Sequence, residues 1–203
     1  MAIIELAKIN LKGGITASDP LLMMNTKEVK RVIEEYSKLQ TLFYTQIDDP
    51  TVMFVIGAWE SKDQHQHGFE GSPQQDEIYG LIKGQMEIEW MHYMDIEQSR
   101  IPINAPVLAM IKETLPSDIQ KTAFDHEFVT RTQRLGGAHY GAVSAWNLLK
   151  DDTEATVRVN FSGWESIKDA TEGIVNTVED VKKFRTRPSE LNFFFVERTR
   201  LDC

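Results

Sequence analysis

Two of the five histidines lie close together in the stretch WESKDQHQHGF, residues 59–69. Histidine can act as a general base near neutral pH because its unperturbed pKa is about 6.5. On a helix His65 and His67, two positions apart, would point in nearly opposite directions and could not bind one metal ion. The stretch is typical of a strand-to-helix joint in which His65 is a candidate general base and no metal site is expected.

A row of polar side chains runs along the stretch ATVRVNFSGW, residues 155–164. Side chains alternate between the faces of a strand, so Arg158, Asn160, Ser162 and Trp164 should share one face. Burying such a row without partners costs a few kcal/mol for each group. Two interpretations stay open: a ligand pocket, in which Asn160 binds a carbonyl or phenol and Arg158 stabilises a developing enolate, or a sheet face solvated at an edge.

The remaining histidines and the aromatic residues supply further candidates. His126 lies beside the apolar arc of an expected helix and could approach Asn160, which makes it a second candidate for proton transfer. His92 lies in an apolar row of an expected strand, where the alternative to a functional role is a satisfied core histidine. The residues that are either core or the lining of a substrate cavity are Trp59, Phe69, His92, Trp90 and Tyr44.

The composition excludes several classes of function. The chain has 203 residues, of which 41% are hydrophobic and 26% charged, values that are typical of a folded globular protein. Its formal net charge of −9 repels phosphate backbones and anionic lipids, so we expect no nucleic acid and no membrane partner. The sequence lacks an apolar run of the roughly 18 residues that span a bilayer. It also lacks the motifs of serine hydrolases, nucleotide-binding proteins and zinc proteases.

The cysteine content and the first residues indicate a compartment. Cys203 is the only cysteine, so no disulfide can form within one chain, which fits a reducing environment. The start of the chain carries Glu5 and Lys8 within an apolar run and has no basic leader, so it predicts a strand rather than a signal peptide. We therefore expect a cytoplasmic protein.

An internal repeat covers most of the chain. GAWES, which contains Trp59, recurs as SGWES, which contains Trp164, 105 residues later, and a glycine follows each tryptophan by nine positions. The expected elements recur in the same order in both halves, β-α-β-β-α-β, which is the ferredoxin-like order. We predict an α+β fold of two ferredoxin-like repeats, residues 1–98 and 104–203.

The repeat and the capping patterns predict local detail. His65 corresponds to Ala170 and should face inward, whereas His67 corresponds to Glu172 and should face water. A Ser or Asn followed three residues later by Glu or Gln is typical of a helix start. The helix starts predicted in this way are Asn25, Ser72, Ser117 and Asn176.

A strand that ends in Trp-x-Ser, a short helix and then a helix start at Ser72-Pro73 occur in this order in the first half. The order resembles the antibiotic biosynthesis monooxygenase superfamily, whose members adopt the dimeric α+β barrel. The resemblance implies two halves packed sheet to sheet as a pseudo-dimer within one chain, which is a monomer or associates further as a homodimer. It does not identify a reaction, because the superfamily includes oxygenases, haem-degrading enzymes, isomerases and decarboxylases.

Two branches of the superfamily can be compared by position. Where the haem-degrading branch has an asparagine and a histidine, this sequence resembles neither, with Ala7 and Tyr79, so no haem is expected. The quinone-forming, cofactor-free oxygenases have Asn-x-x-x-Trp on the third strand, which Asn160 and Trp164 match. The tyrosine that follows in those enzymes is replaced by Ala170. The match implies that Asn160 and Trp164 hold the oxygens of a substrate.

The leading interpretation is an enzyme of secondary metabolism that uses no metal, flavin or haem and binds a flat, apolar phenolic or polyketide-like substrate. In this interpretation Arg158 offsets charge, His126 or His65 moves the proton, and the substrate anion reacts with O₂. A cyclase, isomerase or decarboxylase that uses the same pocket is an alternative. So is a non-catalytic small-molecule binding protein, or a pseudo-dimer whose sites have decayed.

Overall fold

The computed structural model describes residues 2–116, 130, 138–148, 155–184 and 190–201. The chain divides into two compact units. The first consists of Met1–Gln98 with Glu197–Cys203, and the second consists of Ser99–Val196.

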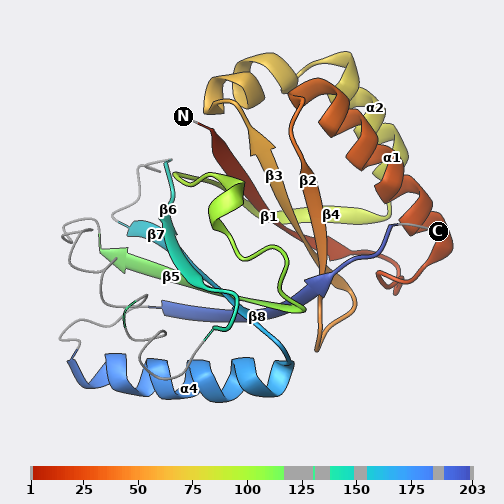
Figure 1. Cartoon of the computed structure of the whole chain (residues 1–203). Helices are drawn as coiled ribbons and strands as arrows, with labels where there is room; N and C mark the ends of the chain where they lie inside the picture. The colour runs from red at the N-terminus through yellow and green to blue at the C-terminus, as the bar shows by residue number, and fades with distance from the viewer. Residues whose placement is uncertain (1, 117–129, 131–137, 149–154, 185–189, 202–203) are drawn as a thin grey trace. The chain divides into compact units, whose positions relative to one another are not determined.

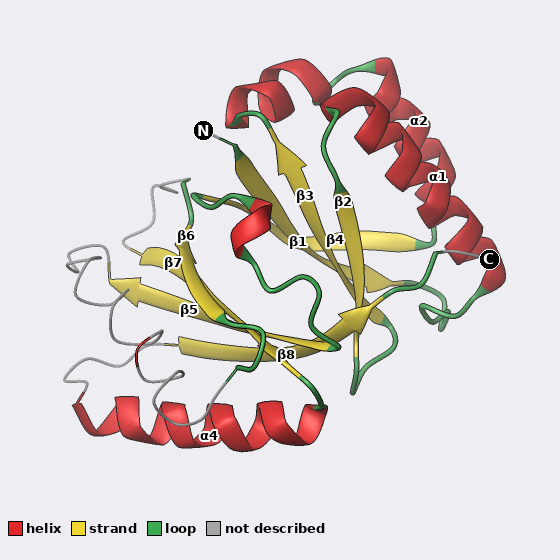
Figure 2. Ribbon diagram, in the orientation of Figure 1, coloured by secondary structure: helices red, strands yellow, loops and turns green. Residues whose placement is uncertain are grey.

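The first unit is a four-stranded antiparallel sheet in the order β4-β1-β3-β2, with its helices on one face (Figure 1). Its chain order, β-α-β-β-α-β, is the ferredoxin-like order that the sequence predicts, with the short helix η1 added after β3 (Figure 2). The elements are β1 (Ile3–Leu11), α1 (Pro20–Ser37), β2 (Thr41–Gln46), β3 (Val52–Trp59), η1 (Gln64–Phe69), α2 (Pro73–Ile82) and β4 (Met86–Met94).

The second unit repeats the sheet with the antiparallel order β8-β5-β7-β6. Its described elements are η2 (Gln98–Arg100), β5 (Val107–Pro116), β6 (Ala142–Trp146), β7 (Ala155–Trp164), α4 (Ile167–Phe184) and β8 (Glu190–Arg198). The helix start predicted at Ser117 lies outside the described residues. The chain is therefore an α+β protein with tandem ferredoxin-like units, as predicted from the order of its elements.

Of the helix starts that were predicted within the described residues, only Ser72 is correct. Ser72 caps α2, with its Oγ accepting a hydrogen bond from the backbone N–H of Gln75 at 3.3 Å, as predicted. The prediction of Asn25 is wrong, because α1 begins at Pro20 and Asp19 accepts from the N–H of Leu22 at 2.9 Å. Proline at the first helical position after an aspartate cap is a stronger start signal than the Asn-x-x-Glu pattern.

The prediction of Asn176 as a helix start is also wrong. The helix α4 begins at Ile167, and the Oγ of Ser166 accepts from the backbone N–H of Asp169 at 3.2 Å. Asn176 therefore lies inside α4.

The glycines that follow the two tryptophans both lie against an aromatic side chain. A Cβ added at Gly68 would lie 2.6 Å from the Oη of Tyr36, and one added at Gly173 would lie 2.2 Å from the ring of Trp164. In both units the helical segment after the third strand thus approaches an aromatic side chain so closely that a Cβ could be added only if that side chain moved. This shared constraint explains why the glycine recurs in the repeat.

A β-bulge in the first unit changes which side chains of β4 face the helices. The register of β1 and β4 shifts between Lys8 and Ile9, so that Met91 and Tyr93 lie on the helix side, opposite Ala7 and Glu5. The strict alternation expected for this strand, which groups Ile88 with Trp90 and His92, is therefore wrong. An extra residue in one strand inverts the alternation beyond it.

Side chains on both faces of the first unit's sheet are buried. Ile4, Leu6, Phe54 and Ile56 are at most 1% exposed on the face away from the helices. In the described part of the chain, no helix is long and apolar enough to cross a membrane.

Candidate functional site

A cavity of about 460 Å³ lies between the sheet of the first unit and the helices that cover it. This volume falls within the range of small-molecule sites, roughly 300–1,000 Å³. Most of its wall is apolar and comes from every strand and helix of the unit. The main apolar lining residues are Ala7, Ile9, Val29, Ile33, Phe43, Val55, Phe69, Ile78, Ile82, Met86, Ile88 and Met91.

The polar end of the cavity is built around His65. The Nε2 of His65 lies 3.1 Å from Glu5 Oε2, and its Nδ1 lies 2.5 Å from the hydroxyl of Tyr93. The same Glu5 oxygen accepts from the indole Nε1 of Trp59 at 2.9 Å. Glu70 Oε1 lies 3.2 Å from both the Tyr93 hydroxyl and His65 Nδ1. The buried imidazole thus lies between two carboxylates, one on each side.

The protonation of Tyr93 determines the direction of these hydrogen bonds. Burial raises the pKa of the Tyr93 phenol, and the negative charges of Glu70 and Glu5 raise it further. The phenol therefore keeps its proton, and its hydroxyl has two acceptors within reach, Glu70 Oε1 at 3.2 Å and His65 Nδ1 at 2.5 Å. A neutral imidazole that accepts at Nδ1 carries its own proton on Nε2, which is then donated to Glu5.

The helical turn after β3 positions His65 and Phe69 on the same side. Residues Gln64–Phe69 form a π-helix, closed by a hydrogen bond from the N–H of Glu70 to the carbonyl of His65 at 2.9 Å. The rings of His65 and Phe69 both contact Trp59, with centroids 4.5 and 5.2 Å away. Single π-helical turns occur frequently at functional sites.

The exposure of the polar side chains increases from one end of the network to the other. The side chain of His65 is 6% exposed and that of Glu5 is 14% exposed, whereas that of Glu70 is 39% exposed. His67, two positions from His65, is 78% exposed. The inward and outward orientations predicted for the two histidines are therefore confirmed, and the network connects the cavity with the solvent.

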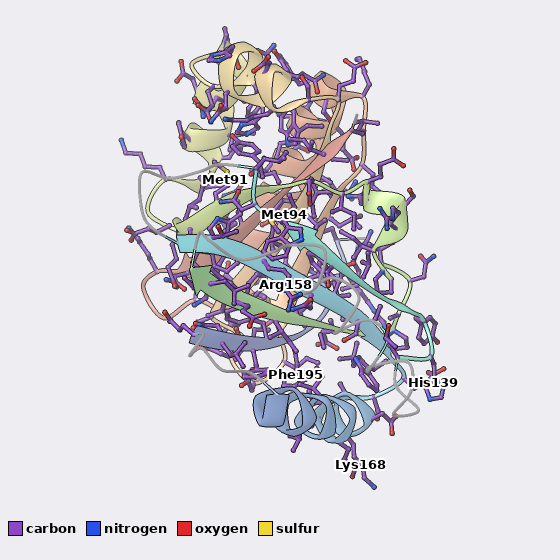
Figure 3. All side chains as sticks on the ribbon, turned by 90° about the vertical axis from the view of Figure 1, so that its left-hand side faces the viewer. Met91, Met94, His139, Arg158, Lys168 and Phe195 are labelled. Atoms are coloured by element: carbon purple, nitrogen blue, oxygen red, sulfur yellow. The ribbon has the colours of Figure 1, made fainter. Side chains whose placement is uncertain are left out.

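The second unit carries its polar row in the middle of β7, where Figure 3 shows Arg158 among the strands. Arg158 Nη2 and Glu113 Oε2 are 2.7 Å apart, and both side chains are 1% exposed. Asn160 accepts a hydrogen bond from the hydroxyl of Ser144 at 2.5 Å. Because the row is buried and hydrogen-bonded, the interpretation as a solvated sheet face is wrong. Its role as a substrate pocket stays a prediction.

The tryptophan of the predicted Asn-x-x-x-Trp motif is also buried. Trp164 is 2% exposed, and its indole N–H donates to the hydroxyl of Ser162 at 2.9 Å. That hydroxyl holds the indole in the second unit as the carboxylate of Glu5 holds Trp59 in the first. The role predicted for Trp164 in binding substrate oxygens stays a prediction.

The structure gathers some of the predicted site residues and separates others. His65, Trp59 and Phe69 meet at the cavity of the first unit. Trp90 and His92 lie on the opposite face of the sheet, on either side of Met91 in β4 (Figure 3). Their rings stack with centroids 5.0 Å apart.

Tyr44 and His126 do not join this group. Tyr44, paired with Phe54, is 1% exposed and lies beneath the guanidinium of Arg198 at 5.5 Å. His126 lies outside the described residues.

Sequence reasoning missed Glu5, Tyr93 and Glu70 as site residues. Glu5 could have been found, because alternation along β1 places it on the same face as Ala7 and Ile9. A carboxylate in such a buried row needs partners. Tyr93 could not, because the bulge in β4 places it on the face that simple alternation assigns to water.

The repeat provides an internal control for this network. Glu5 pairs with Gly57 in β3, and its counterpart in the second unit, which pairs with Ser162 in β7, is Ala109. Tyr93 pairs with Glu5, and Phe195 pairs with Ala109 in the same way. The positions of His65 and Glu70, counted from the tryptophan, are alanine and valine. The four polar residues correspond to Ala109, Phe195, Ala170 and Val175.

All four counterparts are apolar, so the ferredoxin-like scaffold does not require a polar network at this place. Figure 3 shows Phe195 on the side of β8 that faces α4, which is the side equivalent to the cavity of the first unit. Buried polar groups that the fold can replace by apolar ones point to a role outside stability.

At the two positions compared with the haem-degrading branch, the cavity has neither the asparagine nor the histidine of that branch. Ala7 and Tyr79, the positions compared with the haem-degrading branch, both line the cavity, but alanine cannot bind iron. Both nitrogens of the one lining imidazole, His65, are within hydrogen-bond distance of protein oxygens. Among the described residues, no group of three or more His, Cys, Asp or Glu side chains could hold a metal ion.

Neither a protein-family model nor a curated protein matches the chain. Solved structures do match it over nearly its whole length. A protein of Fusobacterium nucleatum named as a putative monooxygenase is 9% identical, with a TM-score of 0.62, and the match covers 98% of this chain and 93% of that one. A variant of chlorite dismutase from Candidatus Nitrospira defluvii is 12% identical, with a TM-score of 0.62 and coverage of 99% and 92%.

An anthrone oxidase-like protein is 10% identical, with a TM-score of 0.56 and coverage of 96% and 91%. Likeness at this level of identity shows a shared fold and not a shared reaction. The whole chain thus has the tandem α+β fold of these proteins, as its repeat and its resemblance to the monooxygenase superfamily predict.

Proposed function

We propose that the chain is a cofactor-free enzyme that removes a proton from an apolar phenolic or polyketide-like substrate, whose anion then reacts with O₂. The observation that carries this proposal is the buried Glu5–His65–Tyr93 network at the end of an apolar cavity, in a scaffold whose other copy has Ala109, Ala170 and Phe195 instead. The fold shared with an anthrone oxidase-like protein is consistent with it.

Glu5 is the proposed base because its carboxylate lines the cavity. Trp59 Nε1 and His65 Nε2 both donate to Oε2, which orients the carboxylate and assigns the incoming proton to Oε1. In the tautomer that this scheme requires, the Tyr93 hydroxyl donates to Nδ1 of His65, so that the imidazole proton lies on Nε2 and is directed at Glu5. Tyr93 and His65 are positioning residues in this scheme, and Glu70 links them to the solvent.

The reaction balances without a further reductant. The substrate methylene between two aromatic rings gives one proton to Glu5, and its electron pair stays on the ring system as an enolate. O₂ takes electrons from this anion and forms a carbon–oxygen bond, and the resulting hydroperoxide recovers a proton from Glu5. Loss of water then converts the original CH₂ into C=O, so that CH₂ and O₂ give C=O and H₂O.

The test is oxygen uptake with 1,8-dihydroxyanthrone in buffer that contains a metal chelator. We expect turnover above the background without protein, with one atom of ¹⁸O₂ in the new carbonyl. Glu5→Gln should lower the rate roughly 10²–10⁴-fold, the usual contribution of a general base. The matched control is His67→Gln, an exposed histidine two positions from His65, which should keep the full rate.

The outcome distinguishes the related reaction classes. Exchange of the methylene hydrogens with D₂O in the absence of oxygen uptake would support proton abstraction and replace oxygenation by an isomerase or cyclase reaction. An unchanged rate in Glu5→Gln would reject Glu5 as the base.

A further inference from the structure

The charged residues that line the cavity of the first unit are all acidic. Its polar end presents the carboxylates of Glu5 and Glu70. The indole N–H of Trp59 already donates to Glu5 Oε2, and His65 Nε2 lies 3.1 Å from the same oxygen. None of the described residues that line the cavity is a lysine or an arginine. The polar end therefore offers hydrogen-bond acceptors that carry negative charge.

The apolar end of the same cavity reaches the surface. Tyr79 of α2 and Ile88 of β4 line the cavity and are 51% and 46% exposed. A ligand with an apolar body can therefore lie against this rim while its polar group reaches Glu5. Burial of the apolar body supplies the affinity, and the polar end selects among head groups.

An anionic head group would meet the charge of Glu5, whose side chain is only 14% exposed, and the charge of the half-exposed Glu70 beside it. Like charges repel more strongly there than in water, because the effective dielectric constant is lower. A hydroxyl head group instead donates to a carboxylate, which forms a charge-assisted hydrogen bond.

We infer that the site selects aromatic ligands whose inserted end is a neutral hydroxyl and rejects those whose inserted end is a carboxylate. Glu5 and Glu70 are the residues that set this selectivity. The inference rests on the proposed function for the location of the substrate, but it concerns binding and needs no turnover.

The experiment compares two ligands that share a ring system and differ in the head group, 2-naphthol and 2-naphthoate, by calorimetric titration at pH 7.5. We expect 2-naphthol to bind at least about tenfold more tightly. Glu5→Gln should reduce this ratio several-fold by strengthening the binding of 2-naphthoate. Glu70→Gln, at a half-exposed position, should act in the same direction and serves as the second variant if Glu5→Gln does not fold.

Two controls locate the effect in the cavity. Ala7→Phe, which fills the cavity, should weaken the binding of both ligands, and His67→Gln should change neither. The inference is overturned if 2-naphthoate binds as tightly as 2-naphthol, if neither ligand binds, or if the ratio stays the same in every folded Glu5 and Glu70 variant. A preference for 2-naphthol without oxygen uptake would reject the proposed function and leave this inference intact.

Discussion

The two units carry their buried polar groups at different positions along the third strand, on equivalent faces of their sheets. In the first unit the polar residues surround Trp59 at the end of β3, and the middle of the strand, at Met53 and Val55, is apolar. In the second unit Trp164 has apolar neighbours where the first has Glu5 and Tyr93, and the middle of β7 carries Arg158 and Asn160.

The difference separates what the scaffold needs from what each unit adds. The apolar middle of the first unit's sheet borders the cavity, with Ile9, Phe43 and Val55 in its wall. The equivalent positions in the second unit are Glu113, Ser144 and Asn160, which bond to one another or to Arg158. We therefore expect the polar network of the first unit to matter for activity and the ion pair of the second unit to matter for stability.

The largest expected effect comes from making the first unit resemble the second. The triple variant Glu5→Ala/His65→Ala/Tyr93→Phe should lose roughly 10²–10⁴-fold in oxygen uptake. Its free energy of unfolding should fall by about 1–3 kcal/mol, because the buried indole N–H of Trp59 loses its acceptor, Glu5 Oε2, while the other members of the network are removed together. Chemical denaturation measures the second quantity.

The single variant His65→Ala is the comparison for this test. It leaves Glu5 and Tyr93 buried without their central partner, and it should cost about 1–3 kcal/mol. A triple variant that is far less stable than this single variant would show that the network holds the first unit together.

The second prediction concerns the ion pair of the second unit. Arg158→Met should destabilise the protein by about 3–5 kcal/mol, because it leaves the carboxylate of Glu113 buried without its countercharge. The double variant Arg158→Met/Glu113→Leu should recover most of this loss. If the single variant is as stable as the wild type but loses activity, the substrate pocket predicted in the second unit gains support instead.

The smallest expected effect is a dependence of stability on alkaline pH. The pKa of Tyr93 is raised in the folded protein, so its proton is retained at a pH where the unfolded chain has lost it. The resulting stability is fully present below the unfolded pKa of about 10 and is lost as the pH rises above it. Thermal melts between pH 9 and 11 should show a shallower decline for Tyr93→Phe, the residue type at the equivalent position in the second unit. An identical decline would contradict this assignment.

The sequence by itself determined the elements and their repetition. Apolar segments and their repeated order predicted all eight described strands, and this order together with the recurrence of GAWES as SGWES predicted two ferredoxin-like units. Both signals are local, since the alternation is a property of each strand and the repeat is a property of the chain. The inward orientation of His65 was accessible for the same reason, because Ala170 marks its position in the other copy.

Only the tertiary structure decided which polar side chains meet. Glu5, His65 and Tyr93 come from β1, η1 and β4, and their contact depends on the pairing of distant strands, on a π-helical turn and on a bulge. A bulge of one residue exchanges the two faces of a strand, and it leaves no periodic signal in the sequence. For this reason the sequence identified His65, Trp59 and Phe69 of the residues around the cavity but missed Glu5 and Tyr93. It also directed attention to Asn160 and His92, which lie elsewhere.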